Sequence, residues 1–175
     1  MIALLVFAVA RPDLPQFAGK AMTGRAIGYP VAALIVPVVW WLGRRRGWAY
    51  PYAVDVLVVL PFLIDMAGNA ANLYDTVTWW DDLNHFVNWA ILVAALGIVL
   101  VRTRLPSAAV FGLAVGFGAV TAILWELLEY VTFIRHSSEL RTAYTDTLGD
   151  LALGLGGSVL AAVGLVLWRG RRVSA

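Results

Sequence analysis

The chain has 175 residues, of which 61% are apolar and only 14% are charged, and its formal net charge is +2. Because about 25% of the residues in an ordinary soluble domain are charged, this composition excludes a water-soluble fold. The absence of cysteine excludes disulfides and thiolate metal sites. The small net charge comes almost wholly from arginines at the ends of the apolar segments, which is typical of membrane topology and predicts no nucleic-acid partner.

The apolar segments, taken in chain order, predict an all-α polytopic transmembrane helix bundle. Residues 1–10 are too few to cross a bilayer and lack the basic start of a signal peptide, so we expect a short helix there. Five longer segments each have about the 17 to 25 residues that cross a hydrocarbon layer of roughly 30 Å. They are residues 26–42, 51–72, 83–101, 107–133 and 151–168. We therefore expect five full spans, six helices in all, in a single integral-membrane domain over residues 1–175.

Basic residues predict how the bundle is oriented in the membrane. The connections between spans alternate sides, and arginines accumulate on the side that includes the carboxyl terminus. That side carries Arg44, Arg45, Arg46, Arg102, Arg104, Arg169, Arg171 and Arg172, against Arg11, Lys20, Arg25, Arg135 and Arg141 on the other. The positive-inside rule predicts a cytoplasmic carboxyl terminus in the cell inner (plasma) membrane. The loop of residues 73–82 has aspartates but no basic residue, so it is expected outside.

With this topology, polar residues of four helices fall at similar depths in the outer half of the membrane. They are Asp65, Asn69, Asn84, His85, Asn88, Glu126, Glu129, Asp146 and Asp150. A charged side chain in hydrocarbon costs at least about 2.5 to 3.5 kcal/mol, so several at one depth must be compensated. A bound cation, shared protons, or ion pairs with His85, Arg135 or Arg141 are the alternatives.

The carboxylates and the imidazole form a candidate site for a divalent cation. The candidate ligands are Asp81, Asp82, His85, Glu126, Glu129, Asp146 and Asp150. One nitrogen and many oxygens suit a hard or borderline ion, and Asp81 or Asp82 can chelate with His85 from one helix turn. The alternative is a structural network of hydrogen bonds and ion pairs, because no motif as specific as His-Glu-x-x-His is present. Asp65, Asn69, Asn84, Asn88 and Arg141 are expected to join this network or to contact a substrate.

Two glutamates are the strongest functional candidates. Helix capping explains an aspartate just before an apolar helix, and so accounts for one member of the pair Asp81 and Asp82. It does not explain Glu126 and Glu129, which lie in the last third of a helix, where the helix dipole disfavours carboxylates. We therefore predict these glutamates as catalytic residues. Elsewhere, close helix packing is predicted by the small-xxx-small pair at positions 112 and 116 and by the small residues of the last helix, which are Gly149, Gly154, Gly156, Gly157 and Ser158.

Three motifs in this region resemble those of a known family. They are WDDLNH at residues 80–85, WELLE at 125–129 and DTLGD at 146–150. Their order and spacing, over residues 54–164, resemble the YjdF-type family of small bacterial inner-membrane proteins, which implies several helices and no settled activity. A looser similarity is to VanZ-like membrane proteins, in which an arginine, here Arg141, precedes an Asp-rich helix start. Glu129 stands where that pattern more usually has glutamine, and the similarity implies, by analogy, action at the cell surface.

Three functions are compatible with these residues, and the sequence does not choose a reaction. The first is a metal-assisted hydrolase or transferase acting on a lipid or cell-envelope substrate, with Glu126 or Glu129 as general base. The second is a proton- or cation-coupled carrier, and the third is a helper or binding subunit of a membrane complex. Few polar residues lie in the inner half of the spans, which favours the functions other than transport. Membrane lipid is the expected partner, and a homo-oligomer or a larger membrane complex is also compatible with the sequence.

Overall fold

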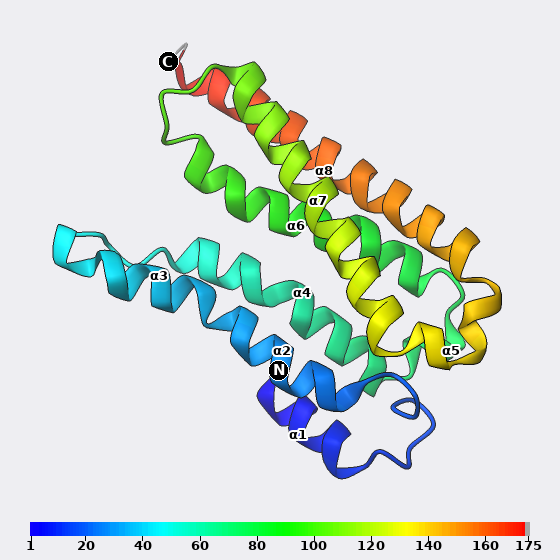
Figure 1. Ribbon diagram of the computed structural model, residues 1–175. Helices are drawn as coiled ribbons and strands as arrows, with labels where there is room; N and C mark the ends of the chain where they lie inside the picture. Colours follow the sequence, from blue (N-terminus) through cyan, green and yellow to red (C-terminus); the bar gives the residue numbers. More distant parts are fainter. Residues whose placement is uncertain (174–175) are drawn as a thin grey trace.

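The computed structural model describes residues 1–173, and within that range it contains helices and no strand (Figure 1). The helices are α1 (Ile2–Ala10), α2 (Met22–Ala33), α3 (Ile35–Gly43), α4 (Tyr52–Ala70), α5 (Leu73–Thr76), α6 (Trp80–Leu100), α7 (Ser107–Thr132) and α8 (Ala143–Val173). Short 3-10 helices occupy Arg44–Arg46, Ile134–His136 and Ser138–Arg141. The carboxyl-terminal Ser174 and Ala175, for which a cytoplasmic location is predicted, lie outside the described residues.

Five helical segments are long and apolar enough to cross a membrane, as the sequence predicts. They are Met22–Arg46, Tyr52–Ala70, Trp80–Leu100, Ser107–His136 and Ala143–Arg171. Helix α1 has 9 residues and is therefore only about 14 Å long, which is too short for a span. The predicted total of six helices is not confirmed, because the first span consists of two helices and α5 adds a further turn.

The break in the first span has a local cause. Helix α2 ends at Ala33 and α3 begins at Ile35. Pro37, in the first turn of α3, has no N–H to donate to the carbonyl of Ala33, and its ring would clash with that carbonyl in a continuous helix. The proline therefore separates α2 from α3 at Leu34.

Helix α6 connects two groups of helices. It packs against α7 and α8 on one side and against α4 on the other, while α1 and α2 pack on α4 (Figure 1). Between α6, α7 and α8, near the carboxyl-terminal end of the bundle, lies an apolar core. Its buried members are Val93, Leu100, Val110, Ala114 and Ala162. A second core, made by α1, α2, α4 and the segment between α1 and α2, contains Leu5, Ala8, Phe17, Met22, Tyr29 and Met66.

Glycines allow α6, α7 and α8 to approach closely, as predicted for the last helix, but not at the pair predicted in α7. A Cβ atom at Gly118 would meet Ser158, and one at Gly157 would meet the backbone carbonyl of Phe86. At positions 112 and 116, by contrast, an added Cβ would have no atom within 4 Å, and both glycines are exposed. The prediction that these two positions lie at a contact between helices of the chain is therefore wrong.

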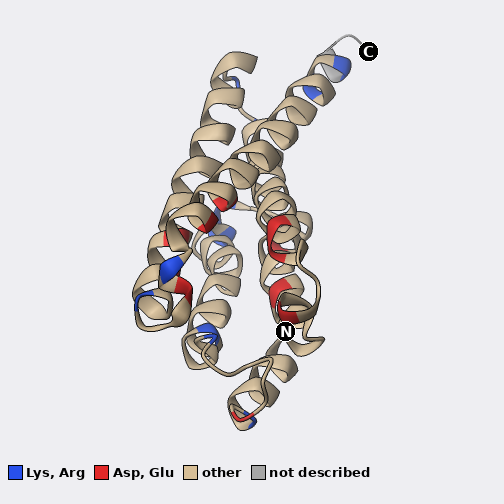
Figure 2. Ribbon diagram, turned by 90° about the vertical axis from the view of Figure 1, so that its right-hand side faces the viewer, with Lys and Arg blue, Asp and Glu red and all other residues tan. Residues whose placement is uncertain are grey.

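Charge is distributed unevenly along the bundle. Figure 2 shows basic residues at the end of α8 that carries the carboxyl terminus, whereas acidic residues lie further along the bundle. The guanidinium of Arg169 donates a 3.2 Å hydrogen bond to the carbonyl of Thr103, which places the loop with Arg102 and Arg104 at the same end. This arrangement is the one that the positive-inside rule associates with a cytoplasmic face.

Single cysteines test this orientation, because the natural chain contains none. Thr76 in α5 and Ser107 at the start of α7 are both exposed and lie in loops expected on opposite sides. In intact cells, we expect an impermeant maleimide to label Thr76→Cys, and to label Ser107→Cys only after the membrane is opened. The reverse labelling pattern would show that the orientation is inverted.

Candidate functional site

Polar side chains gather where α2, α4, α5, α6, α7 and α8 converge, and they form two adjoining clusters. The Asp65 cluster consists of Arg25, Tyr29, Asp65, Asn69 and Tyr74. The His85 cluster consists of Asp81, His85, Glu126, Glu129 and Asp150. Helix periodicity explains the first set locally, because Arg25 and Tyr29 are one turn apart on α2, as are Asp65 and Asn69 on α4.

The Asp65 carboxylate is a buried acceptor with all of its capacity used. Its Oδ2 accepts hydrogen bonds from Arg25 Nη1 at 2.5 Å and from the Tyr29 hydroxyl at 2.7 Å. Its Oδ1 accepts from the Tyr74 hydroxyl at 2.9 Å and from Asn69 Nδ2 at 3.3 Å. Since a carboxylate offers about four lone-pair sites, Asp65 has none left for another ligand. Its pairing with Arg25 is therefore structural.

Tyr74 reaches Asp65 because the chain reverses between α4 and α5. Asn72 adopts a left-handed conformation, with φ of 59°, which asparagine tolerates better than most residues. Burial, together with the nearby Asp65 carboxylate, raises the pKa of the Tyr74 hydroxyl well above its ordinary value. The Tyr74 hydroxyl therefore stays protonated and donates its hydrogen bond to Asp65 at any physiological pH.

The imidazole of His85 lies between carboxylates on both of its nitrogen atoms. Nε2 is 3.7 Å from Asp81 Oδ1 and 3.6 Å from Asp150 Oδ1, whereas Nδ1 is 3.6 Å from Glu126 Oε1. These distances exceed the range of a direct N–H···O hydrogen bond. The residues come from three helices, because Asp81 and His85 are on α6, Glu126 is on α7 and Asp150 is on α8.

Glu126 has one oxygen with a partner and one without. Oε2 accepts a 3.1 Å hydrogen bond from the Thr147 hydroxyl, and this bond fixes the side chain against α8. Oε1 is buried and accepts no hydrogen bond from any described residue, while the whole residue is only 6% exposed. Leaving a buried carboxylate oxygen unpaired costs several kcal/mol, so Oε1 requires a hydrogen-bond donor or a cation.

Glu129 joins the two clusters. Its Oε1 is 3.8 Å from Arg25 Nη2, and ligand atoms of His85, Glu126 and Glu129 lie within 4.8 Å of one another. A second group with the same spread contains Asp81, His85 and Asp150. The convergence of His85, Glu126, Glu129 and Asp150 that the sequence predicts is thus confirmed as geometry, and their roles stay predictions.

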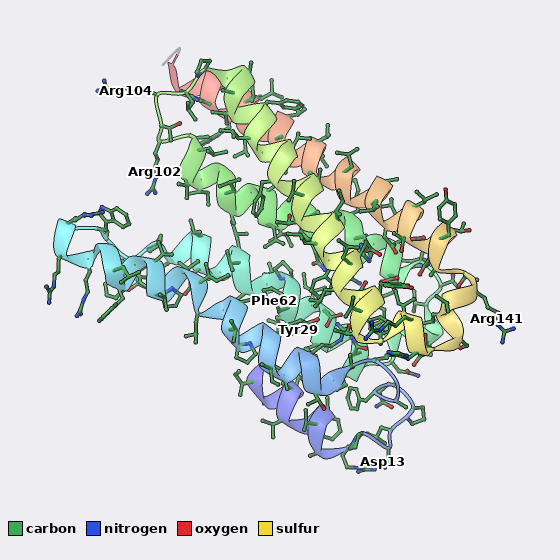
Figure 3. The ribbon with its side chains drawn as sticks, in the orientation of Figure 1. Asp13, Tyr29, Phe62, Arg102, Arg104 and Arg141 are labelled. Atoms are coloured by element: carbon green, nitrogen blue, oxygen red, sulfur yellow. The ribbon has the colours of Figure 1, made fainter. Side chains whose placement is uncertain are left out.

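Other residues predicted for the site lie beside it or away from it. Asp82 and Asp146 are exposed and belong to neither group of possible ligands. Capping is not confirmed, because Asp81 and Asp82 lie inside the first turn of α6, whose N-cap is Trp79. Arg141 is exposed, and Figure 3 shows it pointing away from the bundle.

The two remaining predicted residues stabilise α6 itself. Asn84 donates a 2.7 Å hydrogen bond to the carbonyl of Trp80, and Asn88 donates one of 3.3 Å to Asn84 Oδ1. Both side chains therefore bond along their own helix, one turn apart.

Sequence reasoning missed Arg25, Tyr29 and Tyr74. The sequence predicts Arg25 in a loop, whereas the helix already begins at Met22. An arginine lies one turn before a tyrosine at the start of a long apolar segment. That pattern indicates a buried cation which needs an acidic partner in another helix.

Two cavities adjoin these clusters. The first, of about 70 Å³, has room for an ion or one to two waters and is lined by apolar side chains together with polar ones that include Arg25, Asp65, Asp81, His85 and Glu129. The second, of about 580 Å³, is lined mainly by apolar side chains of α2 and α7. Arg25, Tyr29 and Glu129 line both. Figure 3 shows Tyr29 and its ring partner Phe62, whose centroids are 4.7 Å apart, where α2 meets α4.

Comparison with known proteins supports the membrane assignment without naming an activity. The family model described as predicted membrane protein (DUF2238) matches residues 1–171. No curated protein and no solved structure matches the chain. The match fits the resemblance to YjdF-type proteins, whereas no comparison shows the VanZ-like similarity. Because the match covers nearly the whole sequence, the chain belongs to the DUF2238 family of predicted membrane proteins.

Proposed function

We propose that this membrane protein is a divalent-cation-dependent hydrolase or transferase that acts on a lipid or cell-envelope substrate. The observation that carries the proposal is the position of His85 between carboxylates on both ring nitrogens. A neutral imidazole has one N–H donor and one acceptor nitrogen. With carboxylates beside both ring nitrogens, the nitrogen without a proton faces carboxylate oxygens, and all of these atoms are acceptors. A cation bound between them satisfies them.

The surroundings of the ring support a cation on the Nε2 side. Nδ1 faces a single carboxylate, Glu126, which Thr147 holds in place, and this arrangement suits an Nδ1–H donor. Histidine ligands of metals commonly donate their second N–H to a carboxylate in this way. Nε2, Asp81 and Asp150 would then hold the ion, because their ligand atoms lie within 4.8 Å of one another.

A cation at this place supplies the chemistry of a hydrolase. Bound to a divalent ion, water loses a proton near neutral pH and becomes a strong nucleophile. Glu129 lines the cavity next to the proposed ligands, and so it is positioned as the general base. Arg25 Nη2, 3.8 Å from Glu129, is positioned to stabilise negative charge that develops on the substrate.

The packing of the opposite end of the bundle supports an enzyme or a binding protein over a carrier. In the core of α6, α7 and α8 there, Val93, Val110, Ala114 and Ala162 are fully buried, and none of the buried charged residues of the described chain lies among them. A carrier needs a polar path through such a region.

Metal titration of the purified protein tests the proposal. We expect one Mn²⁺ or Zn²⁺ per chain by isothermal titration calorimetry, with affinity reduced at least about 100-fold in His85→Gln and Asp150→Asn. Glu126→Gln removes only the orienting carboxylate, so a loss of about 10 to 100-fold is expected. Asp82→Asn is the matched control, because Asp82 is exposed beside the site, and its affinity should equal that of the natural chain. Equal binding by His85→Gln and the natural chain would overturn the metal site.

Product analysis tests the enzymatic part separately. Mass spectrometry of a bacterial lipid extract incubated with the Mn²⁺-loaded protein is expected to show a product that Glu129→Gln does not form. If the protein binds the ion but yields no product, the enzymatic proposal is wrong and the protein is instead a binding subunit of a membrane complex.

A further inference from the structure

We infer that the large cavity is a lateral cleft between α2 and α7 that holds the hydrocarbon chain of a phosphate-bearing membrane lipid and places its headgroup at the His85 cluster. The inference rests on the proposed function and specifies its substrate class. The reasons are the shape of the cleft, its opening toward lipid and the charged groups at its polar end.

Helix α2 leaves the cleft open because the face that it turns to α7 carries small residues. Ala21, Gly24, Gly28 and Ala32 line the cavity at intervals of about one turn. A Cβ atom added at Gly24 or Gly28 would have no atom within 4 Å. Such a stripe commonly allows another helix to approach. Here α2 packs on α1 and α4, while α7 packs on α6 and α8.

The walls and the floor of the cleft are apolar, and its mouth faces the surroundings of the bundle. Ile27 on α2 and Leu128 on α7 form the rims and are 66% and 54% exposed. Phe62 on α4 and Leu92 on α6 form the recessed floor. Because α2 and α7 both belong to membrane-spanning segments, the mouth opens to lipid. A recess of about 580 Å³ between two helices suits a flexible hydrocarbon chain.

The polar end of the cleft carries a guanidinium with unused donors. Arg25 Nη1 donates to Tyr29 and Asp65, and Nε donates a 3.0 Å hydrogen bond to the carbonyl of Lys20. Nη2 faces Glu129 at 3.8 Å and makes no hydrogen bond within the described part of the chain. Arginine binds phosphate oxygens through such N–H groups, and a divalent ion in the adjoining smaller cavity would bind the same anion. Because Asp65 and Glu129 already face the guanidinium, a phosphate headgroup is complementary to this end when the proposed ion is bound.

Native mass spectrometry in detergent tests the inference with dioleoylphosphatidylglycerol as the probe and dioleoylglycerol as its phosphate-free counterpart. In the presence of Mn²⁺, we expect each natural chain to retain one phosphatidylglycerol and to retain dioleoylglycerol more weakly. Gly28→Leu fills the cleft and should weaken phosphatidylglycerol binding at least about tenfold, since displacing two buried methylene groups suffices for that loss. Gly24→Leu should weaken phosphatidylglycerol binding to a similar extent.

Gly116→Leu is the matched control, because Gly116 is exposed on α7, has no atom near an added Cβ and does not line the cleft. It should bind the lipid as the natural chain does. Unchanged lipid binding in Gly28→Leu, or equal retention of the two lipids with Mn²⁺, would overturn the inference. So would a dimer of the natural chain that Gly28→Leu abolishes, because the cleft would then be an interface between copies.

Failure of the lipid site and failure of the metal site are distinguishable in these experiments. Gly28 is not among the proposed ligands, so Gly28→Leu should titrate with Mn²⁺ like the natural chain. If the natural chain binds no Mn²⁺ but Gly28→Leu still weakens lipid binding, the lipid site stands and the metal centre is refuted.

Discussion

Replacing Asp65 with alanine is expected to lower the free energy of unfolding by about 3 to 5 kcal/mol, because it leaves the buried Arg25 without its counter-charge. The side chains of Arg25 and Asp65 are only 12% and 10% exposed. Tyr29 and Tyr74 would also lose their common acceptor. Denaturation in mixed micelles, followed by circular dichroism, measures the effect.

A double substitution distinguishes this mechanism from a simple loss of packing. Removing both charges in Arg25→Met combined with Asp65→Leu should cost less than Asp65→Ala alone, because no unpaired charge stays buried. Asp13→Ala serves as the control, since the Arg11–Asp13 ion pair is exposed and its loss should leave stability unchanged. If the double variant is less stable than Asp65→Ala, the charge explanation is wrong.

Gly157→Ala is expected to destabilise the bundle by about 1 to 3 kcal/mol or more, because overpacking forces helices apart. The added methyl group would overlap the backbone carbonyl of Phe86, and a backbone atom cannot rotate away as a side chain can. Separating α6 from α8 also moves His85 away from Asp150. The variant should therefore bind Mn²⁺ more weakly as well as unfold at lower denaturant concentration.

The neighbouring Gly156→Ala is the matched control. Its Cβ would lie 3.5 Å from the Phe86 ring, an ordinary van der Waals contact. Both substitutions improve the helix propensity of α8 equally, by up to about 1 kcal/mol, so only the contact with α6 differs. We expect Gly156→Ala to be as stable as the natural chain or more stable. Similar destabilisation by both variants would show that α6 and α8 are not in contact at Gly157.

The two clusters have different energetic roles although they adjoin. Asp65 accepts hydrogen bonds on both oxygens, so its carboxylate is satisfied without any ligand, and in that cluster only Asn69 Oδ1 is a buried side-chain atom that accepts no hydrogen bond from a described residue. In the His85 cluster, Glu126 Oε1 accepts no hydrogen bond from a described residue, and the histidine contacts exceed hydrogen-bond length. Substitutions in the first cluster should therefore change mainly stability, and substitutions in the second should change mainly ligand binding.

The sequence by itself determined the class of the protein and the neighbourhood of the site. Apolar length predicts spans because only helices satisfy their backbone hydrogen bonds in hydrocarbon, and this holds whatever the packing. The depth of a residue along a helix follows from its distance to the helix end, at 1.5 Å per residue. This rule was sufficient to predict that His85, Glu126, Glu129 and Asp150 lie close together.

Only the tertiary structure decided which polar residues are partners and which glycines lie at contacts. Depth does not specify how a helix is rotated about its axis, so Asp81 faces the cluster while the adjacent Asp82 is exposed. Small-residue spacing likewise occurs both at Gly157, against α6, and at Gly28, where it opens a cleft. The rotation of each helix is set by side-chain packing against its neighbours, which involves residues far apart in the chain. For that reason the pairing of Arg25 with Asp65 appears only in the folded bundle.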